Sequence, residues 1–196
     1  LNIVFGRGQT VGNPLVTHPL VRMVSLTGSI ATGAHIIGAT ADSVKRPHME
    51  LGGKAPVLVF DDADIDAAID GIRTFAFYNA GQDCTAACRL YVQDGSYERF
   101  VERLGAAVAS LKQGLQDAEG TELGPLISAQ HRDKVAGLVQ RAIAQPPIRL
   151  VPGGQVVAGD GFFSEPTVLA DHQPDDALVP HEVFGPVASV TPLTAQ

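Results

Sequence analysis

The chain alternates short apolar runs, rich in β-branched residues, with longer stretches whose apolar residues recur every three or four positions. The short runs lie at residues 2–5, 21–26, 56–60, 89–92 and 187–192. Between them, the stretches that begin at Ile65 and at Tyr97 each present one apolar face at helical spacing. Strands that alternate with helices of this length predict an α/β fold with a mainly parallel sheet.

Composition excludes several classes of function. The 196 residues are 45% hydrophobic and 18% charged, which is typical of a protein with a sizeable core. A net charge of -7 argues against nucleic acid and anionic membrane surfaces as partners. Because every apolar run is short and interrupted, we expect no membrane span, no signal peptide and a cytoplasmic protein.

Three local patterns favour ordinary structural roles. The acidic run FDDADID is expected to cap a helix rather than to bind a metal, so no metal site is predicted. Residues 153–176 are rich in Gly, Pro and Asp and are predicted to form surface loops. The two cysteines, Cys84 and Cys88, match neither a redox nor a zinc spacing, so each is expected to be a single thiol.

Two glycine-containing turns are candidate nucleotide sites. FGRGQTVG, residues 5–12, has the spacing G-x-G-x-x-x-G and misses the dinucleotide fingerprint, so a plain strand-to-helix turn explains it as well. In LTGSIATG, residues 26–33, small side chains precede a helix that begins near Ile30, where free N–H groups can bind a phosphate. Helix capping by Ser29 explains the same residues, and both interpretations stay open.

Two further stretches carry candidate catalytic side chains. In MELGGKAPVLVF, Glu50 precedes a glycine pair and an apolar strand, where a carboxylate can act as a general base, although most single glutamates are only solvated. In YNAGQDCTAACR, Cys88 fits inert core packing. Cys84 follows a polar turn, so we expect it to be exposed and regard it as a candidate nucleophile.

In the order VSLTGS, MELGGK, GQDC and HEVFGP, the chain resembles the aldehyde dehydrogenase superfamily over essentially its whole length. The resemblance implies the end of a Rossmann-like NAD-binding domain, residues 1–53, followed by the first large part of an α/β catalytic domain, residues 54–196. It also implies a fragment that is inactive alone, and a complete polypeptide that forms a dimer or tetramer.

The resemblance assigns roles to residues in each stretch. Cys84 is implied to be the nucleophile and Glu50 the general base. Glu182 is implied to hold the nicotinamide ribose hydroxyls, with Phe184 beside the ring. The residues implied to contact NAD are Thr27, Gly28, Ser29, Ile30, Ala31, Thr32, Leu51, Glu182 and Phe184.

The implied mechanism is covalent. The Cys84 thiolate attacks the aldehyde to give a thiohemiacetal, hydride passes to NAD, and water activated by Glu50 hydrolyses the thioester. The backbone N–H of Cys84 is implied to supply half of the oxyanion hole, with an asparagine upstream of Leu1 as the other half.

Within the superfamily, FGRGQTVG, MVSLTGSIATG, KAPVLVFDDADID and YNAGQDCTAACRLYV resemble the bacterial gamma-aminobutyraldehyde dehydrogenases of putrescine degradation. This narrower resemblance implies a homotetramer in polyamine catabolism that oxidises 4-aminobutanal to 4-aminobutanoate. Betaine-aldehyde dehydrogenases are near relatives and form the alternative within the superfamily.

Asp83 needs an explanation because a carboxylate beside a thiol disfavours the reactive thiolate. Asp83 is one Cα step of about 3.8 Å from Cys84, and the ammonium of an ω-aminoaldehyde lies roughly 5 Å from its carbonyl carbon. We therefore expect Asp83 to select an aldehyde that carries an amino group. The alternative is that Asp83 caps a turn or contacts the backbone.

Three other functions stay open. Acylating semialdehyde dehydrogenases transfer the acyl group to coenzyme A, but they usually lack the glutamate that Glu50 matches. A cysteine hydrolase or thioesterase without NAD needs a histidine base, and none of the six histidines stands in a recognisable Cys–His pattern. An inactive structural relative is disfavoured because Glu50 and Cys84 are both present.

Overall fold

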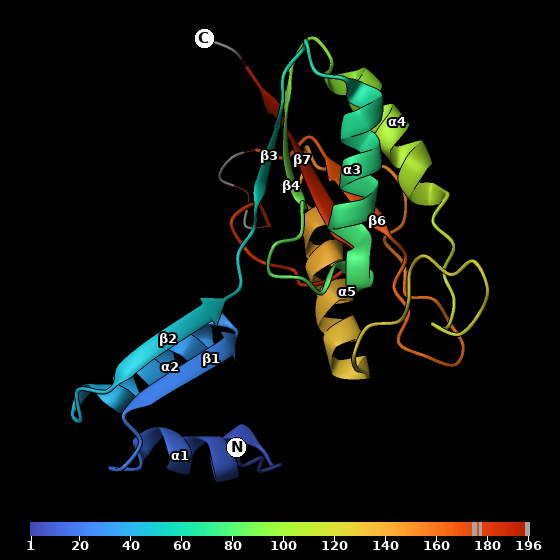
Figure 1. The fold of residues 1–196 in the computed structure, drawn as a ribbon. Helices are drawn as coiled ribbons and strands as arrows, with labels where there is room; N and C mark the ends of the chain where they lie inside the picture. The colour runs from blue at the N-terminus through green and yellow to red at the C-terminus, as the bar shows by residue number, and fades with distance from the viewer. Residues whose placement is uncertain (174–175, 177, 195–196) are drawn as a thin grey trace. The chain divides into compact units, whose positions relative to one another are not determined.

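The structure is a computed structural model that describes every residue except 174–175, 177 and 195–196. Its contacts divide the chain into two compact units, Leu1–Gly52 and Gly53–Gln196, which carry the elements labelled in Figure 1. The assignment of these units to a cofactor domain and a catalytic domain stays a prediction.

The first unit is built on a parallel strand–helix–strand motif. Strands β1 (Met23–Gly28) and β2 (Arg46–Leu51) pair in parallel, and α2 (Ile30–Ala41) connects them, as parallel neighbours require a crossover. Ser29 caps α2, because its hydroxyl accepts a hydrogen bond from the N–H of Thr32 at 3.2 Å. The predicted helix start at Ile30 is confirmed.

The N-terminal segment differs from the prediction. Residues 2–5 were expected to form a strand, but the structure gives them no strand and leaves Phe5 91% exposed. The glycine run after them forms a π-helix, η1 (Gly8–Gly12), that leads into α1 (Asn13–Thr17). In the described part of the chain β1 pairs with β2 alone, so the apolar run lacks the hydrogen-bonded neighbour that a strand needs.

The second unit contains a five-stranded sheet in the order β3-β4-β7-β6-β5. All neighbours are parallel except β5, which runs antiparallel to β6. The strands are β3 (Pro56–Val59), β4 (Arg89–Gln93), β5 (Arg149–Leu150), β6 (Thr167–Ala170) and β7 (Val187–Leu193).

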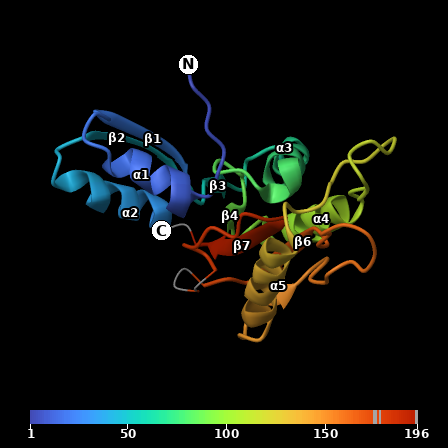
Figure 2. The ribbon, with the colours of Figure 1, turned by 90° about the horizontal axis from the view of Figure 1, so that it is seen from below.

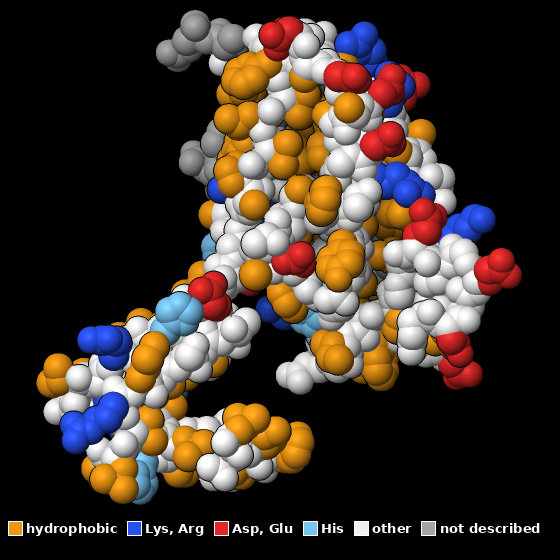
Figure 3. All heavy atoms as spheres, viewed as in Figure 1, with side chains coloured by type: hydrophobic (Ala, Val, Ile, Leu, Met, Phe, Trp, Pro, Cys, Tyr) orange, Lys and Arg blue, Asp and Glu red, His pale blue; other side chains and the backbone are white. Residues whose placement is uncertain are grey.

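Helices cover both faces of this sheet. α3 (Ile65–Phe77) and α4 (Tyr97–Ala109) pack together on one face, and α5 (Ala129–Ile143) lies on the other (Figure 2). Asp64 caps α3, as expected for the acidic run, by accepting a hydrogen bond from the N–H of Ala67 at 3.1 Å. Over α3 and α4, Figure 3 shows acidic and basic side chains interspersed rather than a patch of one sign.

The prediction of surface loops over residues 153–176 is wrong for residues 167–170, and residues 174–175 lie outside the described chain. Residues 167–170 form β6, and all four are buried between β5 and β7. TVLA is a short apolar run of the kind that predicts a buried strand, but the surrounding Gly, Pro and Asp concealed it. The polar helix α5 was not predicted either, because only three of its fifteen residues, Val135, Val139 and Ala142, are buried.

Asp171, the residue after β6, forms a polar network with Tyr97 and Arg149. Its φ of 63° is left-handed, a conformation that costs energy for a residue with a Cβ. The hydroxyl of Tyr97 donates to Asp171 Oδ1 at 3.0 Å and accepts from the Asp171 N–H at 2.7 Å, while Arg149 Nε donates to Oδ2 at 2.8 Å. The hydrogen bond from Arg149, with a smaller one from Tyr97, lowers the pKa of Asp171.

We predict that Asp171→Asn lowers the free energy of unfolding by about 1 kcal/mol at pH 7, because Arg149 and Tyr97 lose a charged acceptor. Since the folded pKa lies below the ordinary value of 3.8, the stabilisation is complete well above that value and is lost as pH falls through and below it. Urea unfolding of wild type and variant between pH 7 and pH 3 measures the difference, which should shrink in acid. A pH-independent difference would contradict the assignment, and Asp133→Asn, at an exposed site, serves as the control.

Candidate active site

The chain reverses sharply just before Cys84. Asn79, Ala80 and Gly81, which follow α3, are three consecutive left-handed residues with φ values of 50°, 56° and 69°. The first two cost roughly 1–2 kcal/mol each, so the loop needs support. Asn79 Nδ2 donates to the carbonyl of Gln82 at 3.0 Å, and Gln82 Nε2 donates to the carbonyl of Asn79 at 3.1 Å. These reciprocal bonds hold the turn that presents Cys84.

The two cysteines differ as expected. Cys84 is exposed, and Cys88 is buried beside β7, where its carbonyl accepts the Ser189 N–H at 2.9 Å. Burial raises the pKa of the Cys88 thiol, which keeps it protonated and inert. The predicted exposure of Cys84 is confirmed, and its role as nucleophile stays a prediction.

Asp83 caps the turn that carries Cys84. Its Oδ1 accepts hydrogen bonds from the N–H and the hydroxyl of Thr85, both at 2.8 Å. The backbone bond, followed by the hydroxyl bond, lowers the pKa of Asp83, so its carboxylate is ionised at neutral pH. Asp83 therefore makes the turn-capping contact that was the alternative to substrate selection. Substrate selection stays a prediction, because a capped carboxylate keeps its negative charge beside Cys84.

The segment HEVFGP lies in the same unit as Cys84. Glu182 Oε1 accepts the backbone N–H of Gly53 at 3.3 Å. Phe184 is left-handed, with φ of 56°. Its carbonyl accepts a hydrogen bond from His131 Nε2 at 2.6 Å, and the two rings meet edge to face with centroids 6.0 Å apart. His131 was not among the predicted site residues.

Backbone contact joins this segment to the loop before Cys84, residues 79–83. A Cβ placed on Gly81 would lie 2.1 Å from the carbonyl oxygen of Gly185, which is far inside van der Waals contact. A Cβ on Gly185 would in turn lie 2.8 Å from a methyl of Val135 on α5. Near the other end of the loop, a Cβ on Gly53 would lie 3.6 Å from the Cys84 carbonyl oxygen. The second unit therefore brings Cys84, Glu182 and Phe184 into one cluster.

A buried lysine anchors the start of the second unit. Lys54, which follows Gly53, is 7% exposed, and its ammonium donates a hydrogen bond to the carbonyl of Leu178. Burial lowers its pKa to about 8, so the group is mainly protonated at neutral pH. This bond holds the chain after Gly53 against the segment that leads to Glu182.

Glu50 and Leu51 end β2 in the first unit. In the strand pair, Glu50 lies opposite Thr27 and Leu51 opposite Gly28, so the predicted residues of both stretches meet at the carboxyl ends of β1 and β2. His48, two residues before Glu50 on the same face, approaches Glu50 Oε1 to 3.5 Å through Nε2. Its Nδ1 lies 3.1 Å from the Ser25 hydroxyl. The H-x-E alternation on a strand was the available signal for this contact, and it was missed.

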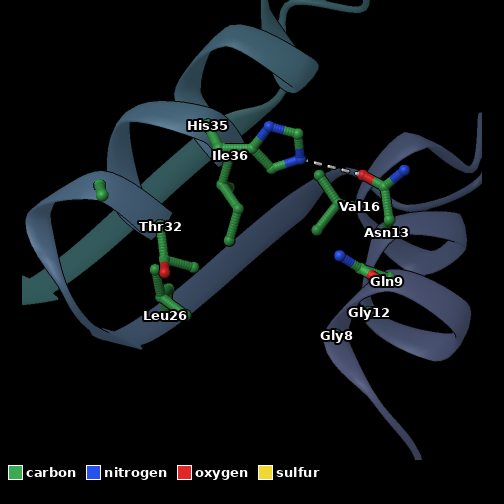
Figure 4. A pocket seen from close by; sticks show the side chains of 10 residues that line it. Gly8, Gln9, Gly12, Asn13, Val16, Leu26, Thr32, His35 and Ile36 are labelled. Carbon is green, nitrogen blue, oxygen red and sulfur yellow. Dashed lines mark hydrogen bonds between the residues drawn. The ribbon is translucent and has the colours of Figure 1, made fainter.

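A pocket of about 590 Å³ opens in the first unit between the π-helix with α1 and the start of α2 (Figure 4). The two glycine-containing stretches, residues 5–12 and 26–33, both contribute residues to its wall. Its wall is largely apolar, with one polar pair in which His35 Nε2 lies 3.3 Å from Asn13 Oδ1. The residues that line the pocket are Gly8, Gln9, Gly12, Asn13, Val16, Leu26, Ala31, Thr32, His35 and Ile36.

Of the residues predicted to contact NAD in this unit, Ala31 and Thr32 line the pocket. Residues 27–30 lie beside it, at the end of β1 and the start of α2. The Leu51 side chain packs on α2, because a Cβ on Gly33 would lie 2.8 Å from it. An apolar slot with a few polar groups suits a planar heteroaromatic ring, so the first unit fits one end of a dinucleotide.

Metal and membrane sites have no structural support in the described residues. Outside residues 174–175, 177 and 195–196, no group of three or more His, Cys, Asp or Glu side chains is arranged to hold a metal ion. None of the described helices has the length and apolar character to cross a bilayer.

We predict that Gly81→Ala lowers the free energy of unfolding by at least about 2 kcal/mol, because the new methyl meets the Gly185 carbonyl and the φ of Gly81 is left-handed. Gly71→Ala is the matched control: Gly71 lies in α3, where an added methyl would meet nothing within 4 Å, and alanine there should add about 0.5–1 kcal/mol. Urea denaturation measures both. Equal tolerance of the two substitutions would show that the loops do not approach as described.

The whole chain, residues 1–196, matches the aldehyde dehydrogenase family. It is 44% identical to the 3-sulfolactaldehyde dehydrogenase of Pseudomonas putida over 95% of this chain and 38% of that protein. It is 41% identical to the lactaldehyde dehydrogenase of Escherichia coli (strain K12) over 96% of this chain and 40% of that protein. The betaine aldehyde dehydrogenase 2 of Rhizobium meliloti (strain 1021) is 44% identical over 96% of this chain and 39% of its own length.

Solved structures of aldehyde dehydrogenases have the same fold as this chain. The lactaldehyde dehydrogenase from Escherichia coli superposes with a TM-score of 0.94 at 39% identity, covering 98% of this chain and 40% of that one. An NAD+ complex of an aldehyde dehydrogenase from Bacillus cereus gives 0.93 at 34% identity, covering 97% and 39%. The α/β fold with a mainly parallel sheet is therefore confirmed. The chain spans about two fifths of the length of the curated relatives it matches, and it belongs to the aldehyde dehydrogenase family.

Proposed function

We propose that the full-length protein containing this chain oxidises an aldehyde to the carboxylic acid with NAD as the electron acceptor. The observation that carries the proposal is the cluster in the second unit, where an exposed Cys84 lies on a braced turn in backbone contact with the segment of Glu182 and Phe184. Family membership supports it, as do relatives named for lactaldehyde, 3-sulfolactaldehyde and betaine aldehyde.

The first unit supports NAD as the cofactor. The pocket between α1 and α2 is large and apolar enough for the adenine ring, and the N-terminus of α2 beside it favours a phosphate. We propose that the residues that contact NAD are residues 27–32, Leu51, Glu182 and Phe184. A solved relative, the betaine aldehyde dehydrogenase of Staphylococcus aureus, is described in complex with NAD+.

In the proposed reaction the Cys84 thiolate forms a bond to the carbonyl carbon, the π electron pair of the carbonyl moves to its oxygen, and the Cys84 N–H stabilises the resulting oxyanion. NAD, when bound, supplies the acceptor for the two electrons and the hydrogen that leave this carbon. Glu50 then takes a proton from water, the water oxygen bonds to the acyl carbon, and the carbon–sulfur bond breaks. Cys84 leaves as the thiolate, and the proton on Glu50 passes to solvent.

The domain assignment follows from these roles. We propose that the first unit is the end of the cofactor-binding domain and that the second is the first large part of the catalytic domain. We also propose that the full-length protein assembles as a dimer or tetramer, as the resemblance implies.

Asp83 supports a narrower proposal for the substrate. Thr85 holds the carboxylate in place and lowers its pKa, so a fixed negative charge stands one residue from the proposed nucleophile. A negative charge there opposes thiolate formation unless a cation offsets it. We propose that the ammonium of 4-aminobutanal is that cation and that the product is 4-aminobutanoate, which places the protein in putrescine degradation.

Cys84→Ser tests the reaction class. The hydroxyl is a far weaker nucleophile than a thiolate, so aldehyde-driven NADH formation by the full-length protein should fall at least about 10³-fold. NAD binding, measured by calorimetry, should persist. Cys88→Ala is the matched control and should keep NADH formation, since Cys88 is a buried core thiol. A wild type that cleaves 4-nitrophenyl acetate yet never reduces NAD would instead be a cysteine hydrolase.

Asp83→Asn tests the substrate class. Asparagine keeps the oxygen that accepts the Thr85 bonds but removes the charge, so the turn should survive. We expect KM for 4-aminobutanal to rise about tenfold or more, because a charge-assisted contact is lost. Butanal is the control substrate, and its KM should change little. Equal effects on both aldehydes would reject charge selection while leaving the dehydrogenase proposal intact.

A further inference from the structure

Phe184 is held in an unfavourable backbone conformation. Its φ of 56° is left-handed, which costs free energy for any residue with a Cβ. The residues on either side of it are closely packed. Val183 is 2% exposed, and the Gly185 carbonyl touches Gly81. Something outside the segment must therefore stabilise Phe184 in this conformation.

His131 makes the stabilising contact. Its Nε2 donates to the Phe184 carbonyl at 2.6 Å, a short bond, and its ring meets the Phe184 ring at an interplanar angle of 65°. His131 thus holds Phe184 at two points, the carbonyl and the side chain of Phe184. The donor is Nε2 because the carbonyl oxygen of Phe184 can only accept.

The helix that carries His131 is itself well anchored. Ser128 caps α5 by accepting the N–H of His131 at 3.2 Å. One turn further on, Val135 is fully buried against Gly185. Just before the helix, the N–H of Ile127 donates to Gln82 Oε1, in the loop before Cys84, at 3.0 Å. The start of α5 therefore contacts both the loop before Cys84 and the segment that contains Phe184.

We infer that His131 is a positioning residue that sets Phe184 and Glu182 in place relative to Cys84. The inference rests on the proposed function, in which Glu182 and Phe184 hold the nicotinamide end of NAD. His131 acts through Phe184, so its loss should weaken cofactor binding without changing how the aldehyde binds. The sequence separates His131 from Phe184 by 53 positions, so the contact exists only in the fold.

The test compares three variants of the full-length protein. His131→Phe keeps an aromatic ring and removes the donor, whereas His131→Gln keeps an N–H donor. His131→Ala removes the ring without adding bulk, so it decides the question if the phenylalanine variant fails to fold. Gln140→Leu is the matched control on the same helix, because Gln140 also donates to a loop carbonyl, that of Gly154 at 3.0 Å, away from the cluster.

Two readouts are needed. For His131→Phe and His131→Ala we expect KM for NAD to rise about tenfold, as for one lost hydrogen bond of above-average strength, with KM for the aldehyde unchanged. His131→Gln should recover most of the loss. Independently of activity, amide hydrogen exchange of residues 181–187 should accelerate at least about threefold in the first two variants and stay near wild type in Gln140→Leu.

The outcomes separate the two proposals. Faster exchange at residues 181–187 in a protein that shows no NAD-dependent oxidation would keep the positioning role of His131 and reject the proposed function. An active wild type whose His131→Ala variant keeps both its KM for NAD and its exchange pattern would overturn the inference alone. A rise in both KM values, not recovered by glutamine, would make His131 a general structural residue and would also overturn it.

Discussion

The candidate active site depends on one close backbone approach, that of Gly81 to the carbonyl of Gly185. No side chain fits between them, since a Cβ on Gly81 would lie 2.1 Å from that oxygen. The approach fixes the loop before Cys84 against the segment of Glu182 and Phe184. Backbone strain is concentrated around this approach, because Asn79, Ala80 and Phe184, on either side of it, all take left-handed conformations.

Much of the fold could be predicted from the sequence because its signals are local. The periodic apolar faces of α3 and α4, and the capping residues Asp64 and Ser29, act within a turn of their own positions. The failures have non-local causes. Residues 2–5 have strand-like side chains but no described partner strand. Residues 167–170 form an interior strand, between β7 and β5, although their neighbours in sequence are typical of loops. Which strands pair is decided by the whole sheet.

The candidate site also contains residues that local sequence predicts and residues that it does not. Cys84, with its exposure, could be predicted from the polar turn around it. His131 could not, because it has no chemical neighbour in the sequence and meets its partner 53 residues away. The Asn13–His35 pair in the pocket joins residues 22 positions apart and was missed for the same reason. Periodicity and short motifs carry no information about such long-range polar contacts.

The hydrogen bonds that fix the turn around Cys84 do not require the negative charge of Asp83. Only the Oδ1 of Asp83 is used to accept the two Thr85 bonds. Asparagine or serine supplies an oxygen for the same kind of turn. A lineage can therefore exchange the charge next to Cys84 through a single substitution while the loop keeps its shape. Under the proposed role of Asp83, the preference for one aldehyde over another can then change among descendants of a single scaffold with little loss of folding stability.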